Sequence, residues 1–133
     1  MTTFYTKRLP AMPDTMAPDG SQVRVLLRMG GGSMAHFELA PGLTSQAVAH
    51  QTVEEIWYFL NGRGEMWRRS GGQEEVVSVV TGVCLTIPVG THFQFRSFGP
   101  DPLAAVGATM PPWPGDAEAY EVPGVWEPRT SET

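Results

Sequence analysis

Apolar and polar side chains alternate along most of this chain, in short runs that end at glycine, proline or Asn-Gly. Because successive side chains of a β-strand point to opposite faces, this period of two predicts many short strands. Helical periodicity is absent apart from one short turn that we expect within residues 116–119. The chain is therefore predicted to be all-β, with strands in residues 23–29, 33–40, 55–60, 64–69, 74–80, 83–87, 93–98 and 103–110 and one further short strand near residues 4–7.

The strand at residues 55–60 has two apolar faces. Alternation places Glu55, Trp57 and Phe59 on one face, and Ile56, Tyr58 and Leu60 on the other. Since both faces are apolar, we expect both to be covered. In the strand at 33–40 the more polar face carries His36, which we expect to be exposed or to have a structural hydrogen bond.

The 133 residues suit one small domain with extended ends. Residues 1–21 are interrupted by three prolines and Asp19-Gly20, which predicts a loop-like N-terminal arm. Residues 22–110 contain the main strands and form the predicted barrel. Residues 111–133 form a C-terminal tail rich in Pro and Trp, which either packs on the outside of a barrel or covers its mouth as a lid.

Two motifs in the predicted barrel resemble those of the cupin superfamily. Gly42, His50, Glu55 and Gly62 match the spacing of the first cupin motif, and Gly82, Pro88 and Gly90 match the second. The resemblance covers roughly residues 22–110 and implies a double-stranded β-helix, or jelly-roll barrel. Small single-domain cupins commonly form homodimers, and burial of the face of Ile56, Tyr58 and Leu60 predicts the same here.

The departures from the cupin motifs affect the metal site that the family implies. Without gaps, two of the four ligand positions fall on Val48 and Phe93, so His50 and Glu55 are the two ligands that remain. His92 lies one residue before a ligand position, and an undisturbed strand would turn it away from the barrel interior. With a β-bulge near residue 90 or 91, His50, Glu55 and His92 would form a ligand set suited to iron, manganese or zinc.

Three functions stay open for such a barrel. We favour a small-molecule-binding barrel with an aromatic pocket and a degenerate or weak metal site, in which His50 and Glu55 could also act as an acid–base pair. The alternative is a metal-dependent enzyme of dioxygenase or isomerase type that uses His50, Glu55 and His92. A third possibility is a structural dimer with a filled barrel. The residues that we expect to contact a ligand are Val48, Trp57, Phe59, Phe93 and Phe95.

Composition excludes other classes of protein. A net charge of −5 with nine Lys and Arg spread along the chain disfavours nucleic-acid binding. No segment reaches the roughly 20 apolar residues of a membrane span, so we expect no membrane partner. A single cysteine, Cys84, cannot form an internal disulfide, and we expect it to be a buried, inert thiol in a cytoplasmic protein.

Overall fold

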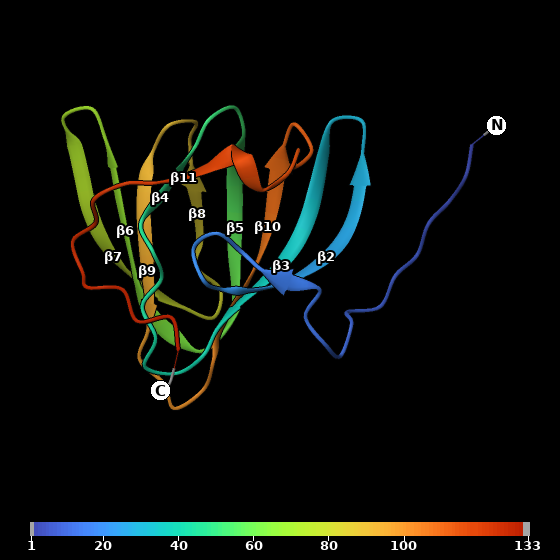
Figure 1. Cartoon of the computed structure of the whole chain (residues 1–133). Coiled ribbons are helices and arrows are strands. Elements are labelled where there is room, and N and C mark those ends of the chain that lie inside the picture. The colour runs from blue at the N-terminus through green and yellow to red at the C-terminus, as the bar shows by residue number, and fades with distance from the viewer. Residues whose placement is uncertain (1, 132–133) are drawn as a thin grey trace.

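The computed structural model describes residues 2–131 as two antiparallel β-sheets that face each other (Figure 1). Apart from one short 3-10 turn, its regular structure is β-strand, which confirms the all-β prediction. The elements are β1 (Thr15–Met16), β2 (Gln22–Met29), β3 (Gly32–Leu39), β4 (Val48–His50), β5 (Glu54–Asn61), β6 (Arg63–Ser70), β7 (Gln73–Val80), β8 (Cys84–Ile87), β9 (His92–Ser97), β10 (Leu103–Met110), η1 (Asp116–Glu118) and β11 (Ala119–Glu121).

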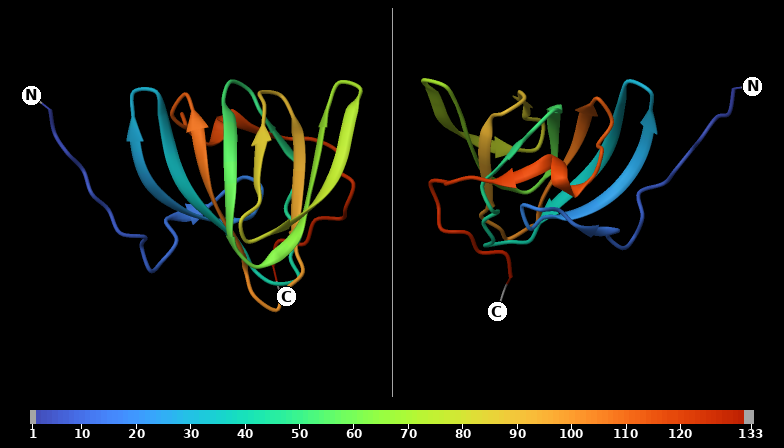
Figure 2. Two further views of the ribbon diagram at one scale, coloured as in Figure 1. Left: turned by 180° about the vertical axis from the view of Figure 1, so that it is seen from behind. Right: turned by 45° about the horizontal axis from the view of Figure 1, so that its top comes forward.

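The path of the chain between the sheets defines the barrel (Figure 2). One sheet has the order β1-β2-β3-β10-β5-β8, and the other has the order β11-β4-β9-β6-β7. From β3 onward the chain changes sheet repeatedly, because β4 and β5, β5 and β6, and β8 and β9 belong to opposite sheets. This alternation winds the chain into the double-stranded β-helix that was predicted.

Asn61-Gly62 makes a different connection from the hairpin turn that its sequence suggests. β5 and β6 do not pair; they lie in opposite sheets, and Gly62 bends the chain across the barrel with φ of 81°. A Cβ on Gly62 would lie 2.3 Å from the Pro102 carbonyl oxygen. Glycine is therefore needed both for the positive φ and for the close approach of the next loop.

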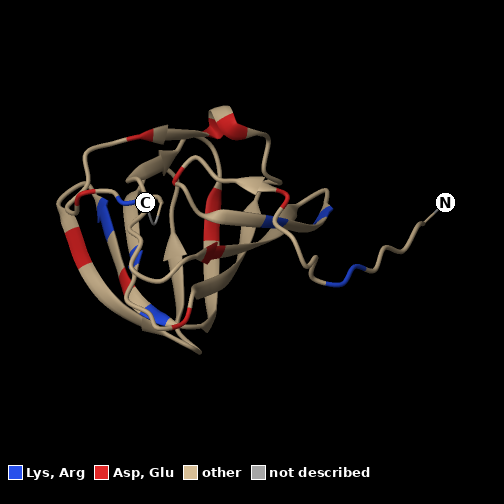
Figure 3. Ribbon diagram, turned by 60° about the horizontal axis from the view of Figure 1, so that its bottom comes forward, with Lys and Arg blue, Asp and Glu red and all other residues tan. Residues whose placement is uncertain are grey.

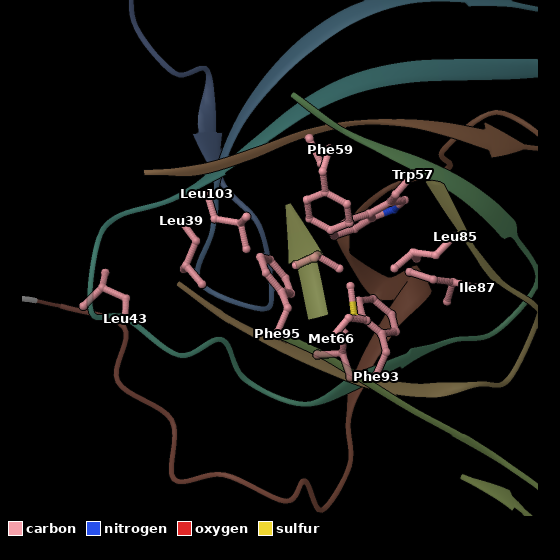
Figure 4. Packing of buried hydrophobic residues seen from close by; sticks show 13 residues of the cluster. Leu39, Leu43, Trp57, Phe59, Met66, Leu85, Ile87, Phe93, Phe95 and Leu103 are labelled. Atoms are coloured by element: carbon pink, nitrogen blue, oxygen red, sulfur yellow. The ribbon is translucent and has the colours of Figure 1, made fainter. Parts of the chain in front are cut away.

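The core lies between the sheets and is formed by alternate residues of facing strands (Figure 4). Trp57 and Phe59 of β5 meet Phe93 and Phe95 of β9, and the ring centroids of Trp57 and Phe95 are 5.2 Å apart. The predicted alternation in β5 is confirmed, since every second side chain is buried. Large apolar residues at this period supply the transfer free energy that holds the two sheets together.

The opposite face of β5 is not covered by any other segment within residues 2–131. Ile56, Tyr58 and Leu60 are 44%, 46% and 41% exposed, so the expectation that both faces are covered is not met by one copy. Cys84 of β8 is also exposed, because its neighbours Leu85 and Ile87 face the core. The prediction of a buried thiol was therefore wrong, because Cys84 lies on the opposite face of β8 from Leu85 and Ile87.

The N-terminal arm departs from prediction in two ways. Residues 4–7 form no strand and lie beyond the edge of β2 (Figure 1), where Lys7 donates a hydrogen bond to the Val25 carbonyl oxygen, whereas β1 pairs with the start of β2. The basic part of this arm is seen in Figure 3. Arg24 of β2 donates hydrogen bonds to the carbonyl oxygens of Pro10 and Ala11 and so holds the arm against the outer face of the sheet. His36, which pairs with Arg24 across the sheet, is 5% exposed, contrary to the prediction of an exposed or hydrogen-bonded side chain.

The C-terminal tail crosses one end of the barrel and then packs on its outer surface. η1 and β11 cross one end of the barrel, where β11 pairs with β4 (Figure 2). The following residues pack on the outer face of β9, where the Gln94 side chain accepts hydrogen bonds from the N–H groups of Val125 and Trp126. Arg96 stacks on the Trp126 ring at 4.2 Å from its centroid. Within residues 2–131, no helix is long and apolar enough to cross a membrane.

Candidate functional site

His50 and Glu55 are brought together by the short turn between β4 and β5. β4 ends at His50, and Glu55 is the second residue of β5. Both side chains are buried, at 5% and 3% exposure, and both line the barrel interior. The distance from His50 Nδ1 to Glu55 Oε1 is 3.8 Å, which is too long for a direct hydrogen bond.

The Glu55 carboxyl group is held by two neighbours on the same inner face. Trp57 Nε1–H donates to Oε1 at 3.1 Å, and the Thr109 hydroxyl donates to Oε2. Burial raises the pKa of Glu55 above its ordinary value, and these two hydrogen bonds oppose the shift only in part. Glu55 is therefore a fixed carboxyl group that can hold a proton at a higher pH than an exposed glutamate.

His50 lies between two aromatic rings. The centroids of Phe93 and Trp113 are 5.3 and 5.2 Å from the imidazole, and both rings are nearly perpendicular to it. Burial lowers the pKa of His50, so the imidazole is neutral at pH 7. Its Nδ1 atom is buried and has no hydrogen-bond partner. A neutral imidazole with an unused nitrogen can accept a proton or a hydrogen bond.

Asp19 is a site residue that sequence reasoning missed, because Asp19-Gly20 indicated only a turn. The loop between β1 and β2 places its side chain against the same cavity, at 5% exposure. Its Oδ1 accepts hydrogen bonds from the backbone N–H and the hydroxyl of Ser21. Burial raises the pKa of Asp19, although these bonds to Ser21 act in the opposite direction. A buried carboxyl group in a loop has no signature in the local sequence.

An open cavity of about 740 Å³ lies at the mouth of the barrel and extends past β2 to Tyr5 of the N-terminal arm, so this part of the barrel is not filled by its own side chains. Of the predicted ligand contacts, Val48, Trp57 and Phe93 line this cavity, whereas Phe59 and Phe95 belong to the packed core beside it. Its walls are mostly apolar, and Phe37 stacks on Trp57 with centroids 4.7 Å apart. The other lining residues include Tyr5, Thr15, Val23, Val25, Leu27, Arg28, Met34, Ala35, Thr109, Trp113 and Asp116.

The C-terminal tail forms part of the cavity wall and is fastened by Glu118. Trp113, Asp116 and Ala119 line the cavity. The Glu118 carboxylate accepts hydrogen bonds from the N–H and hydroxyl groups of Thr52 and from the N–H of Val53. Because Thr52 and Val53 form the turn between His50 and Glu55, this contact fixes the tail beside the two central residues.

The residues at the site do not fit a transition-metal ion. Two of the ligand positions that the cupin resemblance implies are occupied by Val48 and Phe93, which are buried side chains without a donor atom. Across residues 2–131, no group of three or more His, Cys, Asp and Glu side chains could hold a metal ion. Protein sites for such ions usually supply at least three ligands, and the two that lie together here are His50 and Glu55.

His92 lies outside the cavity, which corrects the three-residue ligand set proposed from the sequence. β9 pairs with β6 without a register shift from Ser97 to His92, so side chains alternate regularly along β9. Phe93 and Phe95 therefore face the core, and His92 lies on the face of Gln94. His50, Glu55 and His92 do not form one cluster.

Sequence comparisons give no relatives: no family model matches the chain, and no curated protein matches it. Solved structures give clear matches of the fold. The capsular polysaccharide assembling protein CapF from Staphylococcus aureus aligns with TM-score 0.65 and 17% identity over 80% of this chain and 33% of that chain. This chain therefore spans about a third of the length of CapF.

Two further matches are similar in quality. A predicted oxalate decarboxylase from Thermotoga maritima aligns with TM-score 0.63 and 17% identity over 78% of this chain and 98% of that chain. An oxalate oxidase aligns with TM-score 0.67 and 22% identity, covering 79% and 58% of the two chains. Likeness at this level of identity shows the fold alone. The chain therefore has the cupin fold, a double-stranded β-helix with β1 and β11 added to its two sheets.

Proposed function

We propose that this protein binds a small, largely apolar molecule inside its barrel. The observation that carries the proposal is the cavity of about 740 Å³, which has aromatic walls and three buried titratable groups, Asp19, His50 and Glu55. Small-molecule sites typically have volumes of roughly 300–1,000 Å³, apolar walls and a few polar groups that orient the ligand. A barrel with a merely structural role gains nothing from a cavity of this size, because empty space weakens packing.

The activities named for the structural neighbours do not transfer easily to this site. Oxalate is a small dianion, and an anion needs cationic or metal partners in a buried site. Here the buried titratable groups are two carboxyl groups and a neutral imidazole, and the one arginine of the lining, Arg28, is exposed. The metal-dependent alternative needs three protein ligands close together, and residues 2–131 contain no such group.

Acid–base catalysis on the bound molecule is a second candidate function. It is favoured by the 3.8 Å distance between His50 Nδ1 and Glu55 Oε1 and by the missing partner of Nδ1. A neutral imidazole can take a proton from a substrate while a protonated carboxyl group donates one, which is the requirement of a metal-free isomerisation. In this role His50 is the base and Glu55 is the acid.

A neutral fluorophore tests the binding proposal directly. The wild-type protein should bind 6-propionyl-2-dimethylaminonaphthalene with a blue-shifted emission, because the dye responds to apolar surroundings. Ala35→Trp places an indole in the cavity and should abolish the shift, whereas the matched variant Ala108→Trp, on the opposite face of the neighbouring strand β10, should bind like the wild type. Equal binding by both variants would place the dye elsewhere, and absence of binding to the wild type would refute the proposal.

We also propose that a second copy of the chain covers the outer face of β5. This face presents Ile56, Tyr58 and Leu60 beside the exposed Glu54. The N-terminal arm offers a complementary surface, since Phe4 and Met12 are 90% and 75% exposed and Lys7 and Arg8 lie between them. An apolar and basic segment that extends from one copy suits an apolar and acidic strand on another. A cytoplasmic location remains a prediction from the sequence.

A further inference from the structure

The two buried carboxyl groups of the cavity have no cationic side chain to balance them. Asp19 and Glu55 are 5% and 3% exposed. The ion pairs found within residues 2–131 join Arg24 to Glu38, Arg68 to Glu75 and Arg96 to Glu65, so no Lys or Arg pairs with either cavity carboxyl. The imidazole of His50, which lies 3.8 Å from Glu55, is neutral. A buried carboxylate without a cation is strongly destabilising, and such groups in proteins are commonly kept for a ligand.

A polar atom at the same end of the cavity also lacks a partner. His50 lines the cavity at 5% exposure, and its Nδ1 atom has no hydrogen-bond partner among residues 2–131. Asp19 accepts both of its hydrogen bonds, from the N–H and the hydroxyl group of Ser21, at Oδ1. Buried polar groups are normally satisfied, so the unpartnered His50 Nδ1 indicates a missing hydrogen-bond partner.

Aromatic rings surround this group of acceptors. Phe37, Trp57, Phe93 and Trp113 line the cavity. Trp57 donates to the Glu55 carboxyl group, while Phe93 and Trp113 flank His50. Aromatic faces attract cations through the negative potential above the ring, most strongly where water is excluded. The carboxyl groups and the aromatic rings of the cavity therefore both favour a positively charged ligand.

We propose that the cavity selects a cation, namely an alkyl- or arylammonium compound whose charged group lies at Asp19, His50 and Glu55 and whose apolar body contacts the aromatic walls. This inference rests on the proposed binding function and names the class of ligand. A neutral ligand would leave the two carboxyl groups without a counter-charge, and an anionic ligand would be repelled by them. Burial raises the pKa values of Asp19 and Glu55, and the Glu55 charge adds to the rise at Asp19, so a cation bound beside both carboxyl groups would lower both pKa values.

Two probes of one shape isolate the effect of charge. Phenyltrimethylammonium carries a permanent positive charge, and tert-butylbenzene is its neutral isostere. Displacement of the bound neutral fluorophore measures both affinities on the same wild-type protein. We expect the cation to bind at least about tenfold more tightly, since the aromatic faces attract a desolvated cation and the two carboxyl groups add to that attraction. Equal or tighter binding of the isostere would overturn the assignment.

Conservative variants show whether the carboxyl groups recognise the charge. Asp19→Asn and Glu55→Gln should each weaken the cation about tenfold and leave the affinity of the isostere unchanged. Glu121→Gln, which removes an exposed carboxylate of β11 outside the cavity, is the matched control and should change neither affinity. Loss of affinity for both probes in equal measure would show a structural role for the carboxyl groups and would contradict the inference.

The outcomes separate this inference from the proposed function. Binding of the fluorophore and the isostere without a preference for the cation refutes the ligand class and leaves the binding function intact. Failure of the wild type to bind fluorophore, isostere and cation refutes both. Thermal unfolding shows whether each variant is folded. If Asp19→Asn does not fold, the Glu55→Gln variant and the comparison of the two probes on the wild type still test whether the cavity prefers a cation.

Discussion

Removal of the Glu118 carboxylate tests how the C-terminal tail is fastened to the site. In Glu118→Ala the tail loses three hydrogen bonds, from Thr52 N–H at 2.5 Å, from Thr52 Oγ1 at 2.6 Å and from Val53 N–H at 2.9 Å. Thr52 is exposed and can bond to water instead, but Val53 is 0% exposed, so its N–H is left without a partner. The variant therefore exchanges a buried, satisfied donor for an unsatisfied one.

The magnitude follows from these contacts. One charge-assisted hydrogen bond and the burial of an unpaired N–H together predict a loss of about 2–4 kcal/mol in the free energy of unfolding. For a chain of 133 residues, this lowers Tm by roughly 10 °C. Glu118→Gln keeps one acceptor oxygen without the charge, so we expect about half of this loss. Glu121→Ala, an exposed carboxylate in the same segment, should change stability by less than about 0.5 kcal/mol.

The same contact predicts a dependence on pH. Burial alone would raise the pKa of Glu118, but the hydrogen bonds from Thr52 and Val53 outweigh it and hold the pKa below its ordinary value of 4.5. A lowered folded-state pKa contributes stability that is present above the unfolded-state pKa and is lost as the pH falls through the folded-state pKa. The difference in stability between wild type and Glu118→Gln should therefore shrink in acid below pH 4.5.

Denaturant unfolding at several pH values and hydrogen exchange of the Val53 amide measure these effects. Exchange of this amide should become faster in Glu118→Ala, and the affinity for the cavity fluorophore should fall, because the tail that carries Trp113 is released. Wild-type stability and unchanged Val53 exchange in Glu118→Ala would refute the reasoning.

The remaining predictions concern the site and the outer surface. Burial raises the pKa of Asp19 in the folded state, so wild-type stability should fall as the pH rises through this folded-state pKa. Asp19→Asn should therefore be more stable than wild type at pH 7, and denaturant titrations from pH 4 to 8 measure the difference. Elemental analysis should give the same metal content for wild type and His92→Ala; stoichiometric metal lost in both His92→Ala and His50→Ala would contradict the site described here. Ile56→Glu should convert a dimer to a monomer in light scattering, whereas Glu121→Gln, on the exposed side of β11 in the other sheet, should not; a wild type that is monomeric at high concentration would refute the interface.

The prediction of the fold from sequence succeeded where local periodicity carried the signal. Trp57 and Phe59 face the core because side chains alternate, and Leu103–Met110 is a strand with the predicted bounds. The cupin spacing of Gly42, His50 and Glu55 anticipated two of the three titratable groups of the site. The prediction of burial from periodicity failed at Cys84 and His36. The period of two shows which side chains share a face of a strand, but not which face is covered by another segment.

The sequence by itself determined the strands β2, β3 and β5–β10, the cupin fold and the proximity of His50 to Glu55, because these depend on residues close together in the chain. It gave no sign of the short strands β1, β4 and β11. Only the tertiary structure decided that His92 lies outside the barrel, since the register of β9 against β6 is a property of two strands. Asp19 and Trp113 come to the cavity from opposite ends of the chain. The pairing of β1 with β2 places Asp19, and the hydrogen bonds of Glu118 to the turn before β5 hold the segment that carries Trp113. Contacts of this kind leave no local pattern, because the packing of distant segments brings their side chains together.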